Sequence, residues 1–587
     1  MNSPPVVILG AGCAGLTAAY EFIKQGVRPI VLEKLDKVGG LARTEIYKDY
    51  YFDIGGHRFF SKIDRVNKIW HEMLGDNFQK VRRLSRIYYK GRLFNYPLSI
   101  FNALFNLGIL ESMLVMTSYF NAQFRPHGKE ETFEQWVSNR FGRRLYKTFF
   151  EAYTEKVWGM PCSKIQADWA AQRIKGLSLI AAISNALLGV KTAKSLIDEF
   201  YYPTRGPGMM WQQFKEAIEG EGGKVRLNSE VIGVNHKNGR IANVAFLDGG
   251  KSSEIPIEHL ISSIPVTKLI ALLDPSAPGE VLDASQRLSY RAFIIVVLII
   301  DKEDLFPDQW IYIHDPDVKV GRIQNFKNWS AAMVPDPKKS SVGMEFFCTE
   351  GDEIWTMSDD ELMDLASREL SKLRLTEIDE IIDRFVVRQP GAYPVYDSAY
   401  RNHIEVVKNY LEKFDNLQTI GRNGMHRYNN MDQSMYVGML AVQNYFGTNH
   451  DLWEVNEERE YLEEKKVEIE SINFDNSFSQ AFARMDKLAM ATALGSVSGL
   501  LFFLSTIWIV IKGGDGMALN LELLGQYFVG YTVTLIGAVK GFGYGFIFGF
   551  LFGWLFAYLR NFLFAFYIYR MKKTTELLTL LDFIENL

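Results

Sequence analysis

The feature that most constrains this chain is a glycine-rich turn close to its start. Residues 6–9 (VVIL) are apolar and largely β-branched, and Gly10, Gly12 and Gly15 follow them in the spacing GxGxxG. Residues 16–22 then have the apolar spacing of a helix. A strand, a glycine turn and a helix in this order place a diphosphate at the helix N-terminus. The alternative is a glycine-rich turn in some other α/β unit.

A carboxylate further along strengthens the first interpretation. The second predicted strand, residues 29–32, ends at Glu33. In dinucleotide-binding folds an acidic residue at this point accepts hydrogen bonds from ribose hydroxyls. Together with the glycine turn, Glu33 predicts a dinucleotide site.

Composition excludes several classes of protein. The formal net charge is −4 with both signs mixed along the chain, which argues against a nucleic-acid partner. The three cysteines, Cys13, Cys162 and Cys348, are too far apart in sequence to indicate a disulfide framework or a metal site, so no metal is expected. The glycine turn begins too near Met1 for a signal peptide, so we expect the main body in the cytoplasm.

The C-terminal part of the chain is strongly apolar. Residues 488–511 contain no charge, and residues 541–559 form a second uncharged run. Each is long enough to cross a bilayer, although a buried helix of a soluble protein is the alternative. Cations flank the outer ends of both runs, so the positive-inside rule places both chain ends in the cytoplasm. We therefore expect a two-span protein of the inner (cytoplasmic) membrane, in contact with membrane lipid. The apolar stretch 519–538 is interfacial, re-entrant or part of the second span.

Glycines recur at a four-residue spacing in the second run. On a helix they form a stripe without side chains, which allows another helix to approach closely. The partner is either the first span, which we favour, or the same helix of a second subunit in a homo-oligomer. The stripe consists of Gly537, Gly541, Gly545, Gly549 and Gly553.

Two more glycine turns indicate which dinucleotide is bound. GGLART occupies residues 39–44, and YFDIGGHRFF occupies residues 51–60. The succession resembles the FAD-binding half of the flavoprotein superfamily of amine oxidases, protoporphyrinogen oxidase, phytoene desaturases and UDP-galactopyranose mutase. The resemblance implies FAD as cofactor, with His57 beside the isoalloxazine and Val231 near the adenine. The other residues implied at FAD here are Gly10, Gly12, Gly15, Glu33, Gly39, Gly40, Arg43, Thr44, Gly55 and Gly56.

A segment in the middle of the chain is more specific. FFEAYTEKVWG, residues 149–159, resembles the YTxKxWG segment of UDP-galactopyranose mutases. The resemblance implies a sugar pocket and a phosphate-facing arginine, whereas the alternative is a buried aromatic cluster. LSYR, residues 288–291, resembles another mutase segment and adds Arg291, and Arg322 is a looser candidate; either arginine is alternatively a solvated surface charge. The residues implied at the substrate by the first segment are Tyr153, Thr154, Trp158 and Arg173.

The last strong signal joins GAYP at residues 391–394 to IGRNGMHRYNNMDQ at residues 420–433. It resembles the mutase ending, in which a GR turn leads through YRY to DMD at a helix start that meets the FAD pyrophosphate. Tyr393 and Tyr428 would then bind the substrate phosphate. His426 and Asn430 depart from the pattern, so we expect leaving-group recognition to differ from the UDP enzymes. The residues implied at FAD are Gly421, Arg422, Met431, Asp432 and Gln433.

The resemblance implies a chemistry in which the cofactor supplies the reactive atom. In the mutases, N5 of reduced flavin attacks the anomeric carbon and the sugar recloses with a different ring size. The implied catalytic residues are His57, Arg422 and Tyr428. Our first hypothesis is a membrane-anchored, FAD-dependent sugar mutase (an isomerase). Its substrate would be a nucleotide- or polyprenyl-phosphate-linked sugar for cell-envelope glycan synthesis.

Two alternatives stay open. An FAD-dependent oxidoreductase of the amine oxidase, protoporphyrinogen oxidase or desaturase type, acting on an apolar or lipid-linked substrate, is favoured by SSIP at residues 262–265. The apolar stretches 98–120 and 177–190 also favour it, and they are either buried cap helices or a surface that dips into a bilayer. A scaffold that binds lipid-linked glycans without turnover is the third hypothesis.

The expected fold class is α/β. We predict a Rossmann-like FAD-binding domain with an inserted helical cap and a substrate-binding sheet, followed by a C-terminal helical membrane hairpin. The predicted domain boundaries are 1–92, 201–270 and 391–450 for FAD binding, 93–200 for the helical cap, 271–390 for the sheet, 451–486 for a charged helical linker, and 487–587 for the hairpin and tail.

Overall fold

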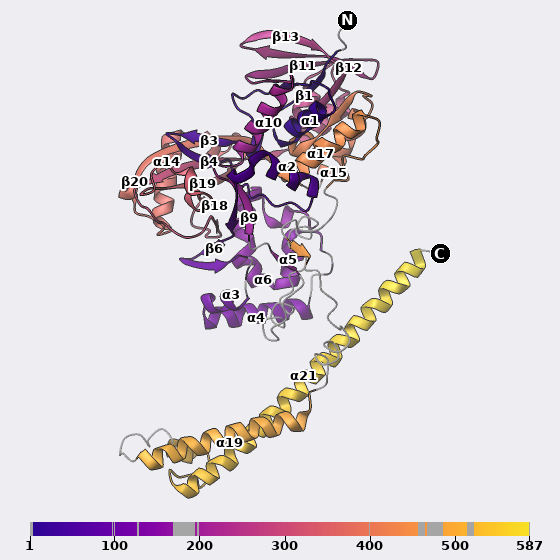
Figure 1. Cartoon of the computed structure of the whole chain (residues 1–587). Helices are drawn as coiled ribbons and strands as arrows, with labels where there is room; N and C mark the ends of the chain where they lie inside the picture. The colour runs from indigo at the N-terminus through magenta and orange to yellow at the C-terminus, as the bar shows by residue number, and fades with distance from the viewer. Residues whose placement is uncertain are drawn as a thin grey trace. The chain divides into compact units, whose positions relative to one another are not determined.

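The chain is described here from a computed structural model, drawn in Figure 1. It divides into two compact units, Met1–Glu468 and Ile469–Leu587. The first unit contains the three glycine turns, and the second contains the two apolar runs. The structure describes residues 4–96, 98, 100–125, 128, 130–167, 194–196, 199–397, 399–455, 464–466, 485–512 and 522–585.

A five-stranded parallel sheet forms the centre of the FAD-binding fold. Its order, β10-β2-β1-β14-β21, brings together three separate parts of the chain. Helices α1, α10 and α17 contribute to one core against it. Strand β1 is buried along its whole length, as is typical of a parallel sheet covered on both faces. The bounds are β1 Val6–Leu9, α1 Cys13–Lys24, β2 Ile30–Leu32, α10 Gly208–Gly220, β10 Lys224–Arg226, β14 His259–Ser262, β21 Leu417–Thr419 and α17 Met431–Tyr445.

A second, four-stranded sheet lies beside the first, in the order β13-β12-β11-β15. Its strands share a core with the helices α11, α12 and α15. Strand β11 begins next to the end of β2, where the Ser229 amide donates to the Glu33 carbonyl at 2.7 Å. The bounds are β11 Ser229–Lys237, β12 Arg240–Asp248, β13 Lys251–Pro256, α11 Val266–Ala271, β15 Leu273–Asp274, α12 Gly279–Arg287 and α15 Tyr400–Leu411.

A seven-stranded mixed sheet has the order β20-β16-β19-β18-β17-β6-β7. Helix α14, Asp359–Lys372, packs on one face. Strand β19 is buried at every position and β16 at all but its first, because both faces of the sheet are covered. The strands are β6 Ser85–Tyr89, β7 Arg92–Asn95, β16 Tyr290–Ile300, β17 Trp310–Ile313, β18 Arg322–Asn325, β19 Ser340–Cys348 and β20 Ile381–Pro394.

The cap contains helices, as predicted, but it is strand at both ends. Strand β7 opens the predicted helical region, and β8 (Lys194–Leu196) and β9 (Glu199–Pro203) close it, with β9 paired to β5 (Phe78–Arg82). The linker prediction is likewise wrong at Glu464–Lys466, strand β22, which pairs with β8. Arg173 and the apolar stretch 177–190 lie outside the described residues. The cap helices are α3 Ile100–Leu107, α4 Ile109–Phe124, α5 Phe133–Phe141, α6 Arg143–Tyr146, the π-helical turn η3 Lys147–Glu151 and α7 Ala152–Trp158.

The second unit is a helical hairpin. Helices α19 (Lys487–Lys512) and α21 (Leu535–Glu585) contain the two segments that are long and apolar enough to cross a membrane, Lys487–Lys512 and Leu535–Phe562. The glycine stripe faces α19: a methyl group at Gly545 or Gly549 would collide with the backbone of Ser498 or Leu494. The first span is therefore the partner of the stripe, the favoured one of the two alternatives. Residues 535–538 of the ambiguous stretch belong to α21.

Candidate functional site

The first glycine turn forms a cradle that fits a diphosphate. Gly10 has φ +94°, and a Cβ on Gly15 would collide with the Gly10 carbonyl, so α1 begins close against the turn. A Cβ on Gly12 would meet only the Cα of Gly40, at 3.8 Å, and otherwise open space. No side chain caps α1, and its first turn contains no acidic residue. The positive end of this helix is therefore available to an anion.

The second glycine turn closes over the first. The Gly39 amide donates to the Ala11 carbonyl at 2.8 Å, and Gly12 and Gly39 form a β-bridge. Glu33 accepts from the Ala11 amide at 2.7 Å and from the Leu35 amide at 3.0 Å, which fixes its carboxylate beside the cradle. Two of its lone-pair positions are used, so it retains the capacity to accept from ribose hydroxyls.

Two residues predicted at FAD in this turn, Arg43 and Thr44, also have protein partners, and their contacts with FAD stay predictions. Arg43 pairs with Glu45 at 2.6 Å and donates to Gln389 Oε1 at 2.7 Å, which ties the turn to β20. The Thr44 hydroxyl accepts from the Gly208 amide at 2.9 Å at the start of α10. These two side chains connect the second glycine turn to β20 and to the start of α10.

The third turn places His57 within electrostatic reach of three arginines, Arg422, Arg322 and Arg43. A Cβ on Gly56 would overlap the ring of Trp310, so this turn packs flat on the seven-stranded sheet. The His57 Nδ1 lies 3.0 Å from the Gly55 carbonyl oxygen. Burial, and next the positive charge of Arg422, lower the pKa of His57 to about 3, so its imidazole is neutral at neutral pH.

Arg422 joins the C-terminal motif to the sheet. Its Nε donates to the Asn429 carbonyl at 2.9 Å and its Nη1 to the Ala392 carbonyl at 3.2 Å. Its guanidinium lies 4.5 Å from the ring centre of Tyr428 and 5.7 Å from that of Tyr393. These two rings are stacked, with centres 5.8 Å apart and planes 10° from parallel. Arg422, Tyr393 and Tyr428 thus form one cluster, and the ligand contacts expected of them stay predictions.

Arg322, the looser candidate, extends this cluster. Its Nη2 donates to the Tyr393 hydroxyl at 2.8 Å and pairs with Glu345 Oε2 at 2.5 Å. Burial raises the pKa of Tyr393 above its usual value, so the phenol keeps its proton. Within the described residues, Nε of Arg322 and Nε1 of Trp310 are buried donors without a hydrogen-bond partner. Such donors are costly in an apolar core, and they fit a site that receives polar groups of a ligand.

In the segment 149–159, Tyr153 and Trp158 each stack on another aromatic ring, and these stacked rings are called the aromatic wall. Tyr153 stacks on His314 with ring centres 4.8 Å apart, and Trp158 stacks on Tyr396 at 6.3 Å. The Tyr396 hydroxyl accepts from the Tyr428 amide at 2.6 Å, so this wall is bonded to the C-terminal motif. Thr154 is buried in the same helix, α7.

Arg291 is bonded to the end of α7. It is buried, and it donates to the carbonyls of Val157 at 3.1 Å and Lys156 at 3.2 Å and to the Thr349 hydroxyl. These bonds satisfy the C-terminal end of α7. Arg291 thus positions the Tyr153–Trp158 segment and is not a solvated surface charge, and its predicted contact with the substrate stays a prediction.

The start of α17 is closed by its own side chains. Asn430 and Gln433 form a reciprocal capping box, and Asp432 accepts from the Ser61 hydroxyl at 3.0 Å. Gly421 and Gly438 pack against Ala14 of α1, which brings the GR turn to the first cradle. The contact predicted between α17 and the pyrophosphate stays a prediction, as do those of Met431 and Val231, which are both buried.

The two residues that depart from the mutase pattern, His426 and Asn430, form contacts with other parts of the protein. His426 is buried, with its ring edge-on to Tyr290 at 4.8 Å and its Nε2 3.4 Å from the Val395 carbonyl oxygen. Asn430 is the cap of α17. The predicted difference in leaving-group recognition stays a prediction.

Sequence reasoning missed several residues that build the site. Glu345 is the ion-pair partner of Arg322, and Lys156 donates to the carbonyls of Ile313, Asp315 and Val320. A single carboxylate inside the apolar run of residues 340–348 was a usable signal, because a buried charge requires a partner. Lys156 was visible within YTEKVWG but had no assigned role.

Comparison with known proteins identifies the family. The family model for flavin containing amine oxidoreductases matches residues 13–401, most of the chain. The chain belongs to this family. It is a flavoenzyme, and FAD is the cofactor that the family and the mutases use.

Curated relatives of the amine oxidoreductase family match shorter stretches. A probable flavin-containing monoamine oxidase A of Dictyostelium discoideum is 29% identical over 144 residues, 22% of this chain and 30% of that protein. A probable UDP-galactopyranose mutase of Klebsiella pneumoniae is 25% identical over 184 residues, 29% of this chain and 44% of that protein. The chain thus spans less than half the length of either relative.

Solved structures share the fold over about three quarters of the chain. A reduced UDP-galactopyranose mutase superposes with a TM-score of 0.68 at 20% identity, covering 78% of this chain and 98% of that one. A putative protoporphyrinogen oxidase from Exiguobacterium superposes with a TM-score of 0.57 at 16% identity, covering 76% and 100%. The α/β FAD-binding fold is therefore confirmed.

The residues present fit FAD. The uncapped start of α1 and the open space at Gly12 suit the pyrophosphate, and Glu33 suits a ribose. The neutral His57 lies within electrostatic reach of Arg422, and Arg322 and Arg422 contact the two stacked tyrosines. We therefore expect the glycine turns to hold the cofactor and the arginine–tyrosine cluster to contact the substrate.

Proposed function

We propose that this chain is a membrane-anchored, FAD-dependent sugar mutase. Its substrate is a sugar linked to a nucleotide or to a polyprenyl phosphate, used in cell-envelope glycan synthesis. The observation that carries the proposal is the cluster in which the stacked rings of Tyr393 and Tyr428 lie between Arg322 and Arg422. Two cations bridged by phenols suit a phosphate ester, because guanidinium groups bind phosphate oxygens strongly.

The two arginines of the cluster have different roles in binding the phosphate. Arg322 is held by Glu345, so its contribution is the orientation of the Tyr393 hydroxyl. Arg422 uses Nε and Nη1 on carbonyl oxygens, and within the described residues its Nη2 has no hydrogen-bond partner. That nitrogen is placed to donate to the phosphate and to stabilise the charge that grows on it as the ester bond breaks.

The remaining residues orient the sugar and control water. Tyr153 and Trp158 provide a stacked aromatic wall on which a pyranose ring packs. His57 stays neutral and is able to hold one hydrogen bond without adding charge. When bound and reduced, FAD supplies the nucleophile for the anomeric carbon.

A second candidate is an oxidoreductase on an apolar or lipid-linked substrate. It is favoured by the family match over residues 13–401 and by the similarity to a probable monoamine oxidase. This candidate requires net electron transfer from the substrate, whereas the mutase leaves the redox state of its cofactor unchanged after each turnover.

One experiment separates the two. The purified full-length protein is reduced with dithionite and given UDP-galactopyranose or a polyprenyl-phosphate-linked hexose, and the ring form of the sugar is measured by chromatography and NMR. We expect furanose and pyranose forms to interconvert, and the oxidised protein to be inactive. Bleaching of the oxidised flavin by an apolar substrate, without any ring isomer from the sugars, would contradict the mutase and support the oxidoreductase.

We also propose that the hairpin of α19 and α21 anchors the enzyme in the inner membrane, with the catalytic unit and both termini cytoplasmic. The two outer ends of the hairpin are joined, because Asn561 exchanges hydrogen bonds with the backbone of Met485 at 2.8 and 3.0 Å. Lys487 and Arg560 lie at these ends, in line with the positive-inside rule. The proposal is tested by resistance to alkaline extraction and by protease access to a C-terminal epitope from the cytoplasmic side.

A further inference from the structure

The cap presents an apolar helix face that nothing in the described part of the first unit covers. Phe105 on α3 is 89% exposed, and Ile109 and Leu110 on α4 are 84% and 76% exposed. Met113, Phe120 and Phe124 continue the same side of α4 at helical spacing, whereas Val115 and Tyr119 on the other side are buried. Exposed apolar residues on this scale mark an interaction surface.

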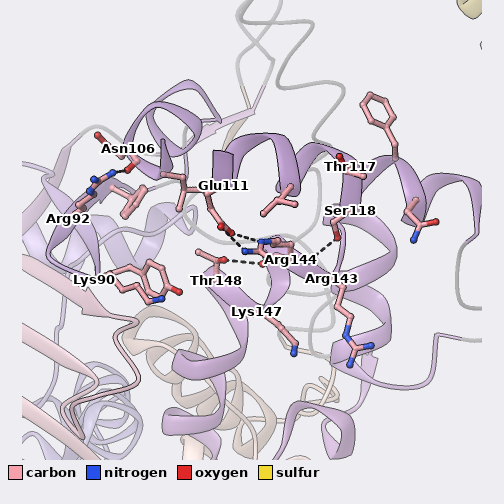
Figure 2. Close-up of a pocket in the computed structure, with 16 residues that line it drawn as sticks. Lys90, Arg92, Asn106, Glu111, Thr117, Ser118, Arg143, Arg144, Lys147 and Thr148 are labelled. Atoms are coloured by element: carbon pink, nitrogen blue, oxygen red, sulfur yellow. Dashed lines mark hydrogen bonds and ion pairs between the residues drawn. The ribbon is translucent and has the colours of Figure 1, made fainter. Parts of the chain in front are cut away.

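A basic pocket of about 1220 Å³ borders this face (Figure 2). Leu114 and Phe120 of α4 form part of its lining, and both are also exposed, so the pocket and the apolar face are continuous. Five cations and one carboxylate line it, and these are Lys90, Arg92, Arg143, Arg144, Lys147 and Glu111.

The positive charge of the pocket is only partly neutralised. Arg144 is bound to Glu111 through two hydrogen bonds of 2.5 and 2.7 Å, as Figure 2 shows. Within the described residues, Lys90, Arg92 and Lys147 form no ion pair, although Arg92 donates to the Asn106 carbonyl. The pocket therefore keeps an excess of positive charge beside an apolar rim.

An apolar helix face next to lysines and arginines has the chemistry of a protein surface that lies in a membrane interface. The same chain contains two helices of bilayer-spanning length, so a bilayer is the partner that the molecule already implies. We propose that α3, α4 and the basic pocket form a second membrane contact, in which the apolar face enters the interface and the pocket binds the phosphate of an anionic lipid headgroup. The contact involves none of the residues placed at the flavin or the sugar, so it holds for either reaction class.

The test uses the full-length FAD-bound protein in vesicles. A photoreactive p-benzoylphenylalanine replaces Leu110 on the apolar face, Ile232 on β11 as a matched exposed control, or Leu501 on α19 as a positive control for the anchor. Figure 1 shows β11 and α4 at opposite ends of the first unit. Lipid adducts are counted by mass spectrometry in phosphatidylcholine vesicles, with and without phosphatidylglycerol.

We expect lipid adducts at residue 110 and not at residue 232, with a higher yield when phosphatidylglycerol is present. Lys90→Glu and Lys147→Glu should each lower the yield by roughly fivefold or more, since one cation near an anionic surface contributes about 1 kcal/mol. Lys237→Glu and Lys251→Glu, on the four-stranded sheet, should leave it unchanged. Inorganic phosphate added to phosphatidylcholine vesicles should not replace the anionic lipid.

Three results would overturn the inference. Adducts at residue 501 but none at residue 110 would leave the anchor standing and remove the second contact. Adducts at neither residue would remove both. An effect of free phosphate equal to that of phosphatidylglycerol would assign the pocket to a soluble anion instead of a lipid headgroup.

Discussion

Tyr393 lies between the two arginines of the site, Arg322 and Arg422. It accepts a hydrogen bond from Arg322 and stacks on Tyr428, which lies under Arg422. Tyr393 and Tyr428 were expected as substrate ligands from their motif and Arg322 as a looser candidate, but the ion pair of Arg322 with Glu345 was not expected. That pair decides which way Arg322 points, and it exists only because β18 and β19 are adjacent in the sheet.

Tyr393→Phe should lower turnover by roughly tenfold to a hundredfold, as expected for the loss of one hydrogen bond to a charged group. The ring remains, so the stacking on Tyr428 and the FAD content should persist. The measurement is the rate of sugar ring interconversion, with flavin absorbance as the check on cofactor. Tyr410→Phe on α15 is the control, and an equal loss of rate in that variant would rule out a specific role for Tyr393.

His57 predicts a pH dependence of stability. Its pKa is about 3 in the folded chain and near 6.5 when unfolded, because burial disfavours the imidazolium. Between these values the unfolded state binds more protons, so the free energy of unfolding falls as the pH falls below about 6.5. His57→Asn should therefore lose less stability than the unaltered chain between about pH 7 and pH 5. Urea unfolding of the FAD-free protein measures this, and His450→Asn, at an exposed histidine, should behave like the unaltered chain.

At the scale of elements, substitutions in the turn between β1 and α1 should affect cofactor binding and folding separately. Gly12→Ala adds a methyl group that meets only open space and the Cα of Gly40, so the FAD-free protein should keep its stability. FAD affinity should fall by roughly fivefold to a hundredfold, equivalent to about 1–3 kcal/mol, because the methyl group enters the space of the pyrophosphate.

Gly15→Ala, in contrast to Gly12→Ala, should lower the stability of the FAD-free protein. Its Cβ would collide with the Gly10 carbonyl, so the FAD-free protein should itself unfold more easily. Both variants are measured by urea unfolding without FAD and by FAD titration. If Gly12→Ala destabilised the FAD-free protein as much as Gly15→Ala, the assignment of the open space at Gly12 to the cofactor would be wrong.

Two glycines on α21 of the hairpin, Gly549 and Gly543, have different surroundings and can be compared directly. A Cβ on Gly549 would meet the backbone of Leu494 and the side chain of Ser498, whereas a Cβ on Gly543 would have nothing within 4 Å. Gly549→Val should therefore weaken the association of α19 with α21 by about 1–3 kcal/mol, and Gly543→Val should change little. Heat denaturation in detergent, followed by proteolysis of the loop between the helices, reports the difference. Equal sensitivity of the two variants would contradict the close packing of the stripe.

At the scale of the whole molecule, the two compact units predict separable functions. A chain ending at Glu468 contains all of the first unit and lacks both apolar helices. It should fold, retain FAD and become extractable from membranes, whereas the full chain should resist alkaline extraction. Residual binding to anionic vesicles should be lost at high salt, because screening weakens the basic pocket of the cap. Loss of FAD from the shortened chain would show that the first unit depends on the second.

The sequence alone was sufficient for the local features of this protein. The glycine turns, Glu33 and the two apolar runs act through backbone geometry and helix length, which neighbouring residues specify. Their consequences, an FAD-binding α/β fold and a helical hairpin, therefore follow from short stretches of residues. The choice of α19 as partner of the glycine stripe was favoured but not decided by sequence.

Only the tertiary structure decided what the charged side chains do. Arg291, Arg322 and Arg43 look alike in sequence, yet one satisfies the end of α7, one is paired with Glu345 beside Tyr393, and one ties the second glycine turn to β20. The physical reason is that a buried guanidinium takes whichever carbonyl or carboxylate the fold brings within reach, and these partners are distant in sequence. The opening glycine turn thus holds the cofactor by local rules, while the residues expected to choose the substrate are placed by the sheets.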